Sequence, residues 1–380
     1  ASDSRWWATL MDKLRKVTDK DMDAIEIGAA ILGTGGGGNP YIGKLRCLEE
    51  LRKGREINVI PLDELADDAL VVSLGGIGAP VVGVEKIEQG EECLLALRAL
   101  EQELDCKVDA LISAEIGGAN SMEPMLTAAQ AGIPVVDGDG MGRAFPEMQM
   151  TTWSIYGHTS TPSAMVDDKG NVVVIRDTVD EYWVETLARA TVVAMGAAAG
   201  LASAPMRGEF VKRAAIPHTI TQALSLGQSV LEAQKDNIDP IQTVLDHETG
   251  RLLMTGKIVD LQRHLKGGFA VGHVEIAGFG HFNGETGRID LQNEFLVFRR
   301  NDQVEVCVPD LIVVLDADTG LPITTEVLRY GQRIAVLALP CHDLLRTPEA
   351  LVVVGPAAFG YHDITFTPMP RSTQTPVLRS

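Results

Sequence analysis

Residues 107–120, KVDALISAEIGGAN, join a short apolar run to a glycine-rich loop, and this combination recurs along the first half of the chain. The run ALISA has the length and composition of a buried strand. Helical patterns stand on either side of it, in residues 85–104 and 122–132. Parallel strands need crossover connections, so this alternation predicts a mostly parallel sheet covered by helices.

The sequence changes character in its second half. From Arg251 onward, short β-rich runs such as GHVEIAGFG and RIDLQNEFLVFRR are separated by turn signals. Many short strands with such punctuation are typical of a β-barrel or sandwich. We therefore expect an α/β domain over residues 1–240, including a long helix over residues 181–202, followed by a β-rich, barrel-like domain over residues 241–380.

Composition excludes several classes of partner. The 380 residues are 45% hydrophobic and 22% charged, as in an ordinary globular protein, and the formal net charge is -19. So acidic a surface repels nucleic acid and anionic membranes, which leaves a small molecule as the expected ligand. The five cysteines are scattered without a C-x-x-C pair, and the first residues lack a long apolar run, so we expect a cytoplasmic protein.

The stretch Leu32–Pro40, LGTGGGGNP, resembles a nucleotide-phosphate loop only superficially. The dinucleotide fingerprint must follow a strand, whereas a helical pattern precedes this loop. A P-loop needs Ser or Thr after its lysine, but Leu45 follows Lys44, and Pro40 lacks an amide hydrogen. The loop therefore does not predict a nucleotide cofactor. It is either a flexible linker or a loop whose backbone approaches a ligand or another loop closely.

Three further glycine-rich loops each follow an apolar strand: GGIGAP after Leu74, EIGGAN after Ala114 and DGDGMGRAFPE after Val136. The carboxyl ends of strands line the ligand crevice in open α/β sheets, so we expect all four loops to surround one site. Arg143 or Glu147 could orient a substrate carboxylate; the alternative is that the two side chains only pair with each other. The candidate substrate-binding residues are Gly35, Gly36, Gly37, Gly38, Asn39, Gly117, Gly118, Asn120, Arg143 and Glu147.

Carboxylates on these loops are the candidate catalytic groups. Glu115, Asp137 and Asp139 can divide acid and base roles, and the two aspartates can share a divalent metal ion. His158, in a Ser/Thr/Pro-rich loop, is a candidate general acid. The structural alternatives are a turn cap for Glu115 and a tight turn with backbone hydrogen bonds for the aspartates.

Four motifs together carry a family resemblance: ILGTGGGGNP, EIGGANSMEP, GIPVVDGDGMGRAFPEMQM and PDLIVVLDADTGLPITTEVLRYGQRIAVLALP. From about Asp19 to Pro370, in the same order, the chain resembles the S-methyl thiohydantoin desulfurase family. The resemblance implies an α/β N-terminal domain and a β-barrel-like C-terminal domain. It also implies a hydrolysis in which water replaces a methylthio group on the ring, releasing methanethiol and leaving a hydantoin.

That chemistry needs an activated water, a donor to the ring and an acid for the leaving thiol. We expect Asp137 and Asp139 to act as base or metal ligands with Glu115 as the second carboxylate. The amides of Gly35–Gly38, or of Gly117 and Gly118, would hold the ring oxygen. A non-catalytic subunit or ligand-binding partner of a hydantoinase-type enzyme is the alternative function, and a homo-oligomer stays open.

Overall fold

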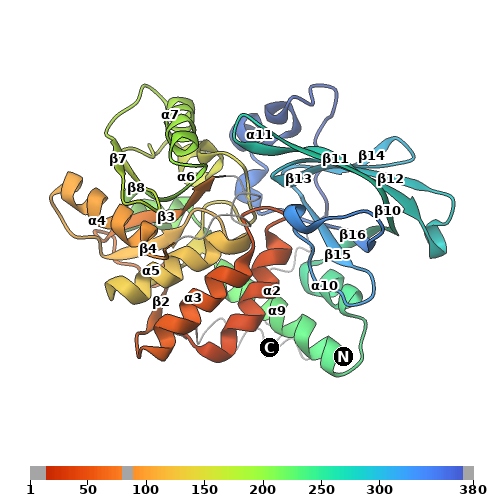
Figure 1. Cartoon of the computed structure of the whole chain (residues 1–380), viewed down its shortest axis with the longest axis horizontal. Coiled ribbons are helices and arrows are strands. Elements are labelled where there is room, and N and C mark those ends of the chain that lie inside the picture. The colour runs from red at the N-terminus through yellow and green to blue at the C-terminus, as the bar shows by residue number, and fades with distance from the viewer. Residues whose placement is uncertain (1–13, 79–88, 371–380) are drawn as a thin grey trace.

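The protein is described by a computed structural model that covers residues 14–78 and 89–370. Two β-sheets stand side by side, with helices below and between them (Figure 1). The helices are α2 (Met22–Leu32), α3 (Pro40–Arg52), α4 (Glu92–Leu104), α5 (Met122–Ala131), α6 (Thr152–Ile155), α7 (Glu181–Ala194), α8 (Gly208–Ala214), α9 (Thr219–Lys235), α10 (Pro240–Glu248) and α11 (Pro348–Val354).

The first sheet forms an α/β domain, as the sequence predicts. Its strands are β1 (Lys16–Val17), β2 (Ile57–Pro61), β3 (Leu70–Gly78), β4 (Ala110–Ser113), β5 (Val135–Asp139), β6 (Ser163–Val166), β7 (Val172–Ile175), β8 (Ala198–Arg207) and β9 (Ile216–Pro217). The neighbours β2, β5, β4 and β3 are parallel, and antiparallel strands extend the sheet on both sides in the order β1-β2-β5-β4-β3-β8-β6-β7. β9 pairs with β5.

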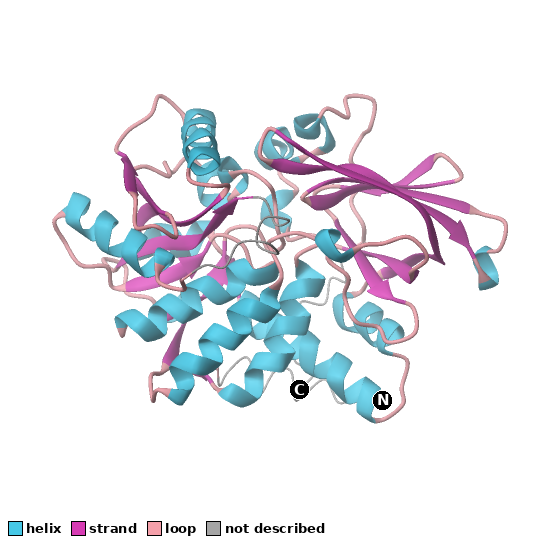
Figure 2. Ribbon diagram, in the orientation of Figure 1, coloured by secondary structure: helices cyan, strands magenta, loops and turns pink. Residues whose placement is uncertain are grey.

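Helices cover both faces of this sheet (Figure 2). Val72 on one face packs in the same core as residues of α4 and α5, while its neighbour Val71 packs with residues of α8 on the other face. This alternation follows from the two-residue period of a strand. It explains why the parallel strands read as continuous apolar runs.

The predicted long helix over residues 181–202 is wrong in its second half. α7 ends at Ala194, and residues 198–207 form β8, which pairs with both β3 and β6. The Ala/Gly-rich sequence resembles a helix, but small side chains are needed here because the N-terminus of α4 crosses the strand closely. A Cβ atom on Gly200 would lie 2.5 Å from the backbone nitrogen of Cys93. Tertiary packing therefore overrides helix propensity.

The second sheet is a curled antiparallel half-barrel, in agreement with the predicted barrel-like domain. Its strands are β10 (Arg251–Lys266), β11 (Phe269–Gly278), β12 (Thr286–Gln292), β13 (Glu294–Arg300), β14 (Gln303–Cys307), β15 (Leu311–Asp316) and β16 (Arg333–Leu339). They follow the order β14-β13-β12-β11-β10-β16-β15. The predicted boundary at residue 240 falls between the last strand of the first sheet and β10.

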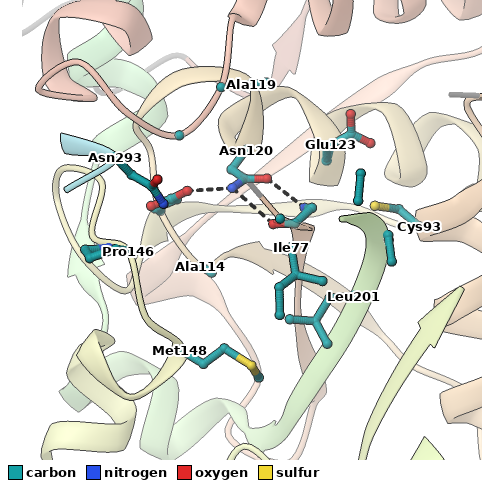
Figure 3. A pocket seen from close by; sticks show the side chains of 18 of the residues that line it. Ile77, Cys93, Ala114, Ala119, Asn120, Glu123, Pro146, Met148, Leu201 and Asn293 are labelled. Atoms are coloured by element: carbon teal, nitrogen blue, oxygen red, sulfur yellow. Dashed lines mark hydrogen bonds between the residues drawn. The ribbon is translucent and has the colours of Figure 1, made fainter. Parts of the chain in front are cut away.

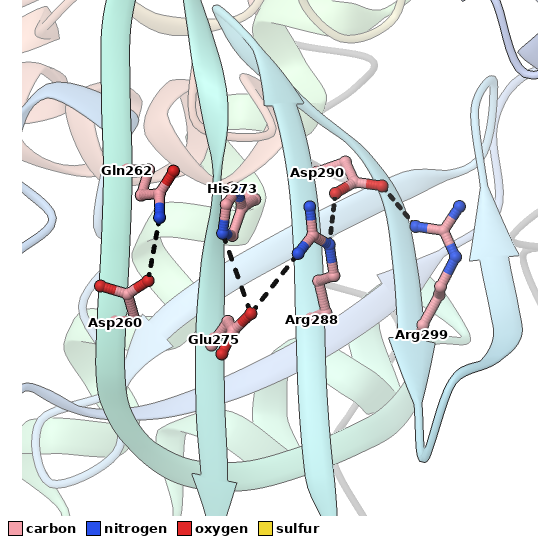
Figure 4. A network of polar contacts seen from close by, with 7 residues as sticks. All are labelled: Asp260, Gln262, His273, Glu275, Arg288, Asp290 and Arg299. Carbon is pink, nitrogen blue, oxygen red and sulfur yellow. Dashed lines mark hydrogen bonds and ion pairs between the residues drawn. The ribbon is translucent and has the colours of Figure 1, made fainter.

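The two faces of the half-barrel differ in polarity. Val274, Ile276 and Ile289 point into an apolar core. On the opposite face, Figure 4 shows ion pairs that cross from strand to strand: Arg288 of β12 lies 3.4 Å from Glu275 of β11, and Asp290 of β12 pairs with Arg299 of β13. The alternation of apolar and charged residues favours this register, because a slip by one residue would turn these charges toward the apolar core.

A shared core joins the two sheets. α2 packs along α9 and also touches β15. One apolar cluster includes Leu74 of β3, Leu224 of α9 and Leu337 of β16. Within the described residues, no helix is both long and apolar enough to cross a membrane.

Candidate active site

A pocket of about 570 Å³ lies at the carboxyl ends of β3, β4 and β5. The turn between β12 and β13, which carries Asn293, completes its wall from the second sheet (Figure 3). Ile77 and Leu201 belong to one apolar cluster, against which Met148 packs, and form the apolar part of the lining. The loops that the sequence placed together thus meet in one pocket, although Gly75–Gly78, predicted as loop, continues β3. Ala79 and Pro80 lie outside the described residues.

Glu115 follows β4 and lines the pocket with only 6% of its surface exposed. Its carboxylate accepts hydrogen bonds from Asn120 Nδ2 at 2.5 Å and from the amide of Phe145 at 3.1 Å. Asn120 is itself held by the backbone of Gly76, with its Oδ1 accepting at 2.7 Å (Figure 3). Burial raises the pKa of Glu115 to about 7, against these hydrogen bonds, which lower it.

Glu294, which sequence analysis missed, brings a second buried carboxylate to the same pocket. It begins β13, directly after Asn293, whose φ of 57° makes the sharp turn from β12. Burial, and then the charge of Glu115, raise the pKa of Glu294 well above its usual value, while the amide of Gly37 opposes the shift. Its Oε2 atom is buried with no hydrogen-bond partner in the described parts of the chain.

Glu115 and Glu294, one from each sheet, therefore bring two buried carboxyl groups to one pocket. The charge of Glu115 is one cause of the raised pKa of Glu294, so Glu294 favours its protonated form while Glu115 is ionised. A protonated carboxyl beside an ionised carboxylate supplies a general acid and a general base at one site.

The glycine loops pack against one another. A Cβ on Gly37 would lie 2.1 Å from the carbonyl oxygen of Gly117, and one on Gly118 would lie 2.4 Å from that of Gly38. The carbonyls of Gly37 and Gly38 accept hydrogen bonds from the amides of Asn120 and Ala119. The run of glycines thus allows backbone to touch backbone, which holds Glu115 and Asn120 in place.

Only part of the predicted binding set reaches the pocket lining. Gly37, Gly38, Asn39, Asn120 and Glu147 line the pocket. Asn39 also caps α3, because its Oδ1 accepts from the amide of Tyr41 at 2.9 Å. Gly35, Gly36, Gly117 and Gly118 lie behind the lining, in the contacts between loops.

Asp137 and Asp139 lie outside the pocket lining. Asp137 accepts from the amides of Ile220 and Thr221, so it caps the N-terminus of α9. Asp139 Oδ2 accepts from three amides, including that of Ile116 at 2.7 Å. Burial raises the pKa of Asp139 to about 7. Both carboxylates bind backbone amides: those of Asp139 include the local amides of Met141 and Gly142, whereas those of Asp137 belong to α9.

Arg143 and His158 also lie outside the lining, and Arg143 does not pair with Glu147. The Arg143 guanidinium is completely buried and donates to the carbonyls of Pro309 and Asp310, both at 2.9 Å, so it ties the second sheet to the first. His158 Nε2 lies 3.1 Å from the carbonyl oxygen of Pro205, and burial lowers its pKa.

Residues 14–78 and 89–370 contain no group of three or more His, Cys, Asp or Glu side chains arranged to hold a metal ion. The predicted sharing of a divalent ion by Asp137 and Asp139 has no support in their hydrogen bonds, since those we see bind backbone amides and the Thr221 hydroxyl.

The fold and pocket define a class: two-domain proteins in which an α/β sheet and a half-barrel together enclose a buried carboxylate pair. Family comparison then identifies the group. The chain belongs to the S-methyl thiohydantoin desulfurase-like (S-Me-THD-like) family, whose N-terminal domain matches residues 20–177 and whose C-terminal domain matches residues 179–369. The resemblance noted in the sequence is thus confirmed.

No curated protein matches the chain. The chain is similar to a protein from Chromobacterium violaceum with an X-ray structure, at 24% sequence identity and a TM-score of 0.75. The match covers 93% of this chain and 100% of the other. At this identity the likeness shows the fold alone.

Proposed function

We propose that the protein is a hydrolase that converts an S-methyl thiohydantoin into a hydantoin and methanethiol, or that hydrolyses a closely related cyclic amide. The observation that carries this proposal is the meeting of two buried carboxyl groups with raised pKa values, Glu115 and Glu294, in one pocket. Membership of a family named after S-methyl thiohydantoin supports the choice of ring.

Glu115 is the better base and Glu294 the better acid. A pKa of about 7 leaves an appreciable fraction of Glu115 ionised at neutral pH, whereas the strongly raised pKa of Glu294 favours its protonated form. Asn120 and the amide of Phe145 fix the Glu115 carboxylate, which limits the positions from which it can activate a water.

The proposed reaction balances without a co-reactant other than water. Glu115 takes a proton from water as the oxygen attacks the carbon between the two ring nitrogens, and Glu294 protonates the ring nitrogen of the C=N bond. In the resulting intermediate, Glu294 takes back a proton from the new hydroxyl as the carbon–sulfur bond breaks. Glu115 gives its proton to the leaving sulfur, so both carboxyls return to their starting states.

The test is release of thiol from S-methyl thiohydantoin, measured with a chromogenic thiol reagent. Glu115→Gln and Glu294→Gln should each lower kcat by about 100-fold or more, because each removes one proton-transfer group. Glu101→Gln is the matched control. Glu101 is a buried glutamate of α4 with ion pairs to Arg98 and Lys107, and it lies outside the pocket lining.

The outcomes separate the two functional classes. Thiol release that survives in both pocket variants would refute the assigned roles. Tight binding of hydantoin without any thiol release by the wild type would favour the alternative, a ligand-binding partner of a hydantoinase-type enzyme.

A further inference from the structure

Arg189 is a pocket residue that neither the predicted site nor the proposed proton transfers use. It comes from α7, and three contacts hold its guanidinium: Nε donates to Glu185 Oε1 at 2.7 Å, Nη2 donates to the carbonyl oxygen of Pro146 at 3.0 Å, and the ring of Phe269 lies 4.5 Å away. Its side chain is 11% exposed. The planar group is therefore fixed before any ligand binds.

One nitrogen of this guanidinium has no partner. Nη1 is buried and makes no hydrogen bond within residues 14–78 and 89–370, while the side chain lines the pocket. A buried donor without an acceptor costs about 1–3 kcal/mol, and more when it is charged. Nη1 itself has almost no accessible surface, but the side chain lines the pocket, so a small rotation of the guanidinium would present this donor to an oxygen of the molecule that occupies the pocket.

Charge decides what kind of oxygen fits. Glu185 already balances the positive charge of Arg189, and Glu147, whose pKa burial raises against the smaller, lowering effect of the Arg189 charge, lines the same pocket. A carboxylate on the ligand would add an unbalanced negative charge beside these groups, whereas a carbonyl oxygen adds none. A neutral acceptor is therefore favoured.

Arg189 is also close to the proposed base. The amide of Phe145 donates to Glu115, and the carbonyl of the next residue, Pro146, accepts from Arg189. Two residues of chain separate the two contacts, so Glu115 and Arg189 lie within about 13 Å of each other. A small ring with its substituents can span much of this interval.

We propose that Arg189 Nη1 donates a hydrogen bond to the ring carbonyl oxygen that the reaction leaves unchanged, and so selects rings that carry this oxygen. The inference rests on the proposed function, because it assumes a hydantoin-like ring. It assigns to Arg189 the ring-oxygen contact that the sequence analysis assigned to glycine amides.

Calorimetric titration with two neutral rings tests the assignment. Hydantoin carries both carbonyl oxygens, whereas 2-imidazolidinone lacks the carbonyl that the reaction leaves unchanged. The wild type should bind hydantoin about 10- to 100-fold more tightly, as expected for a hydrogen bond to a charged donor. Arg189→Met should lose this preference and bind the two rings nearly equally.

Arg333→Met is the matched control, because Arg333 also stacks on a phenylalanine, 4.4 Å from the Phe279 ring, and pairs with Asp318, outside the pocket lining. It should keep the wild-type preference. The preference is the ratio of the affinities for hydantoin and 2-imidazolidinone, measured in the same variant. A general loss of stability in Arg189→Met would lower both affinities and leave this ratio unchanged.

A preference that persists in Arg189→Met would overturn the assignment. Tighter binding of a carboxymethyl-substituted hydantoin than of its carboxamide, lost in Arg189→Met, would also overturn it in favour of an anionic acceptor. Failure of hydantoin to bind the wild type would overturn both this inference and the proposal that the substrate is a hydantoin-like ring. Arg189-dependent hydantoin binding without thiol release would refute only the proposed reaction.

Discussion

Gly36→Ala is the sharpest probe of the carboxylate pair, because Gly36 lies directly behind Glu294. A Cβ atom on Gly36 would sit 1.9 Å from Glu294 Oε1 and 2.4 Å from its Cδ. Real Cβ contacts do not fall below 3.0 Å, so the carboxylate must move by at least 1.1 Å, the difference between 3.0 and 1.9. Overpacking of this kind costs about 1–3 kcal/mol, and a catalytic group displaced by 1 Å loses about 100-fold in rate.

The assay is a double-mutant cycle on the free energy of urea unfolding, combined with thiol release. Gly36→Ala should be destabilising in the wild-type chain but cost less than about 0.5 kcal/mol in a Glu294→Ala background, where the clash is absent. The Glu294→Ala background is itself the control, because it keeps the Gly→Ala change at residue 36 and removes the carboxylate that the new Cβ atom meets. Equal costs of Gly36→Ala in both backgrounds would refute the contact between Gly36 and Glu294.

Glu115→Gln should remove the loss of kcat/KM below about pH 7, which rate–pH profiles measure, because burial raises the pKa of Glu115 to about 7 and the base acts only when ionised. The raised pKa also means that the folded chain binds a proton that the unfolded chain releases near pH 4.3, so the unfolding free energy should fall from about pH 5 to 7. Urea titrations should show a shallower fall in Glu115→Gln. Asp137→Ala should cost about 1–2 kcal/mol by uncapping α9 and leave kcat unchanged; loss of turnover at unchanged stability would restore its catalytic role. His158→Gln should keep initial rates of thiol release between about pH 6 and 8, since the imidazole lies outside the pocket lining.

Local patterns predicted much of the fold. The helices at residues 22–32 and 40–52 have clear starts: a capping box at Thr18 and Asp21 precedes the first, and Asn39 with Pro40 begins the second. The sequence does not predict β8, because its alanines and glycines are required by the close packing of helix α4 against the strand. This packing is a tertiary contact, so it produces no periodic pattern of apolar residues in the sequence of β8.

The candidate site was predictable only in part. Glu115 and Asn120 follow a strand directly, and that position signals a site. Glu294 begins an apolar strand in the other domain, and only the sheet packing brings it to Glu115. Its one local signal is an acidic residue at the start of the apolar run FLVF, after the turn at Asn293. Asp137 and Asp139 come directly after the apolar run of β5, in a sequence position like that of Glu115, but the structure places both within the strand, and the sequence cannot show that their carboxylates face amides.

The position of β8 has a consequence for synthesis of the chain. Among the strands of residues 14–78 and 89–370, the hairpin of β6 and β7 pairs with the rest of the first sheet only through β8, which pairs with β3. Residues 20–177, the N-terminal family domain, therefore leave the ribosome with β3 unpaired on one side and the hairpin unattached. The sheet can close only after residue 207 has emerged, and the exposed edge of β3 is a site for wrong pairing until then. We expect a nascent chain stopped at residue 177 to need a chaperone that one stopped at residue 240 does not.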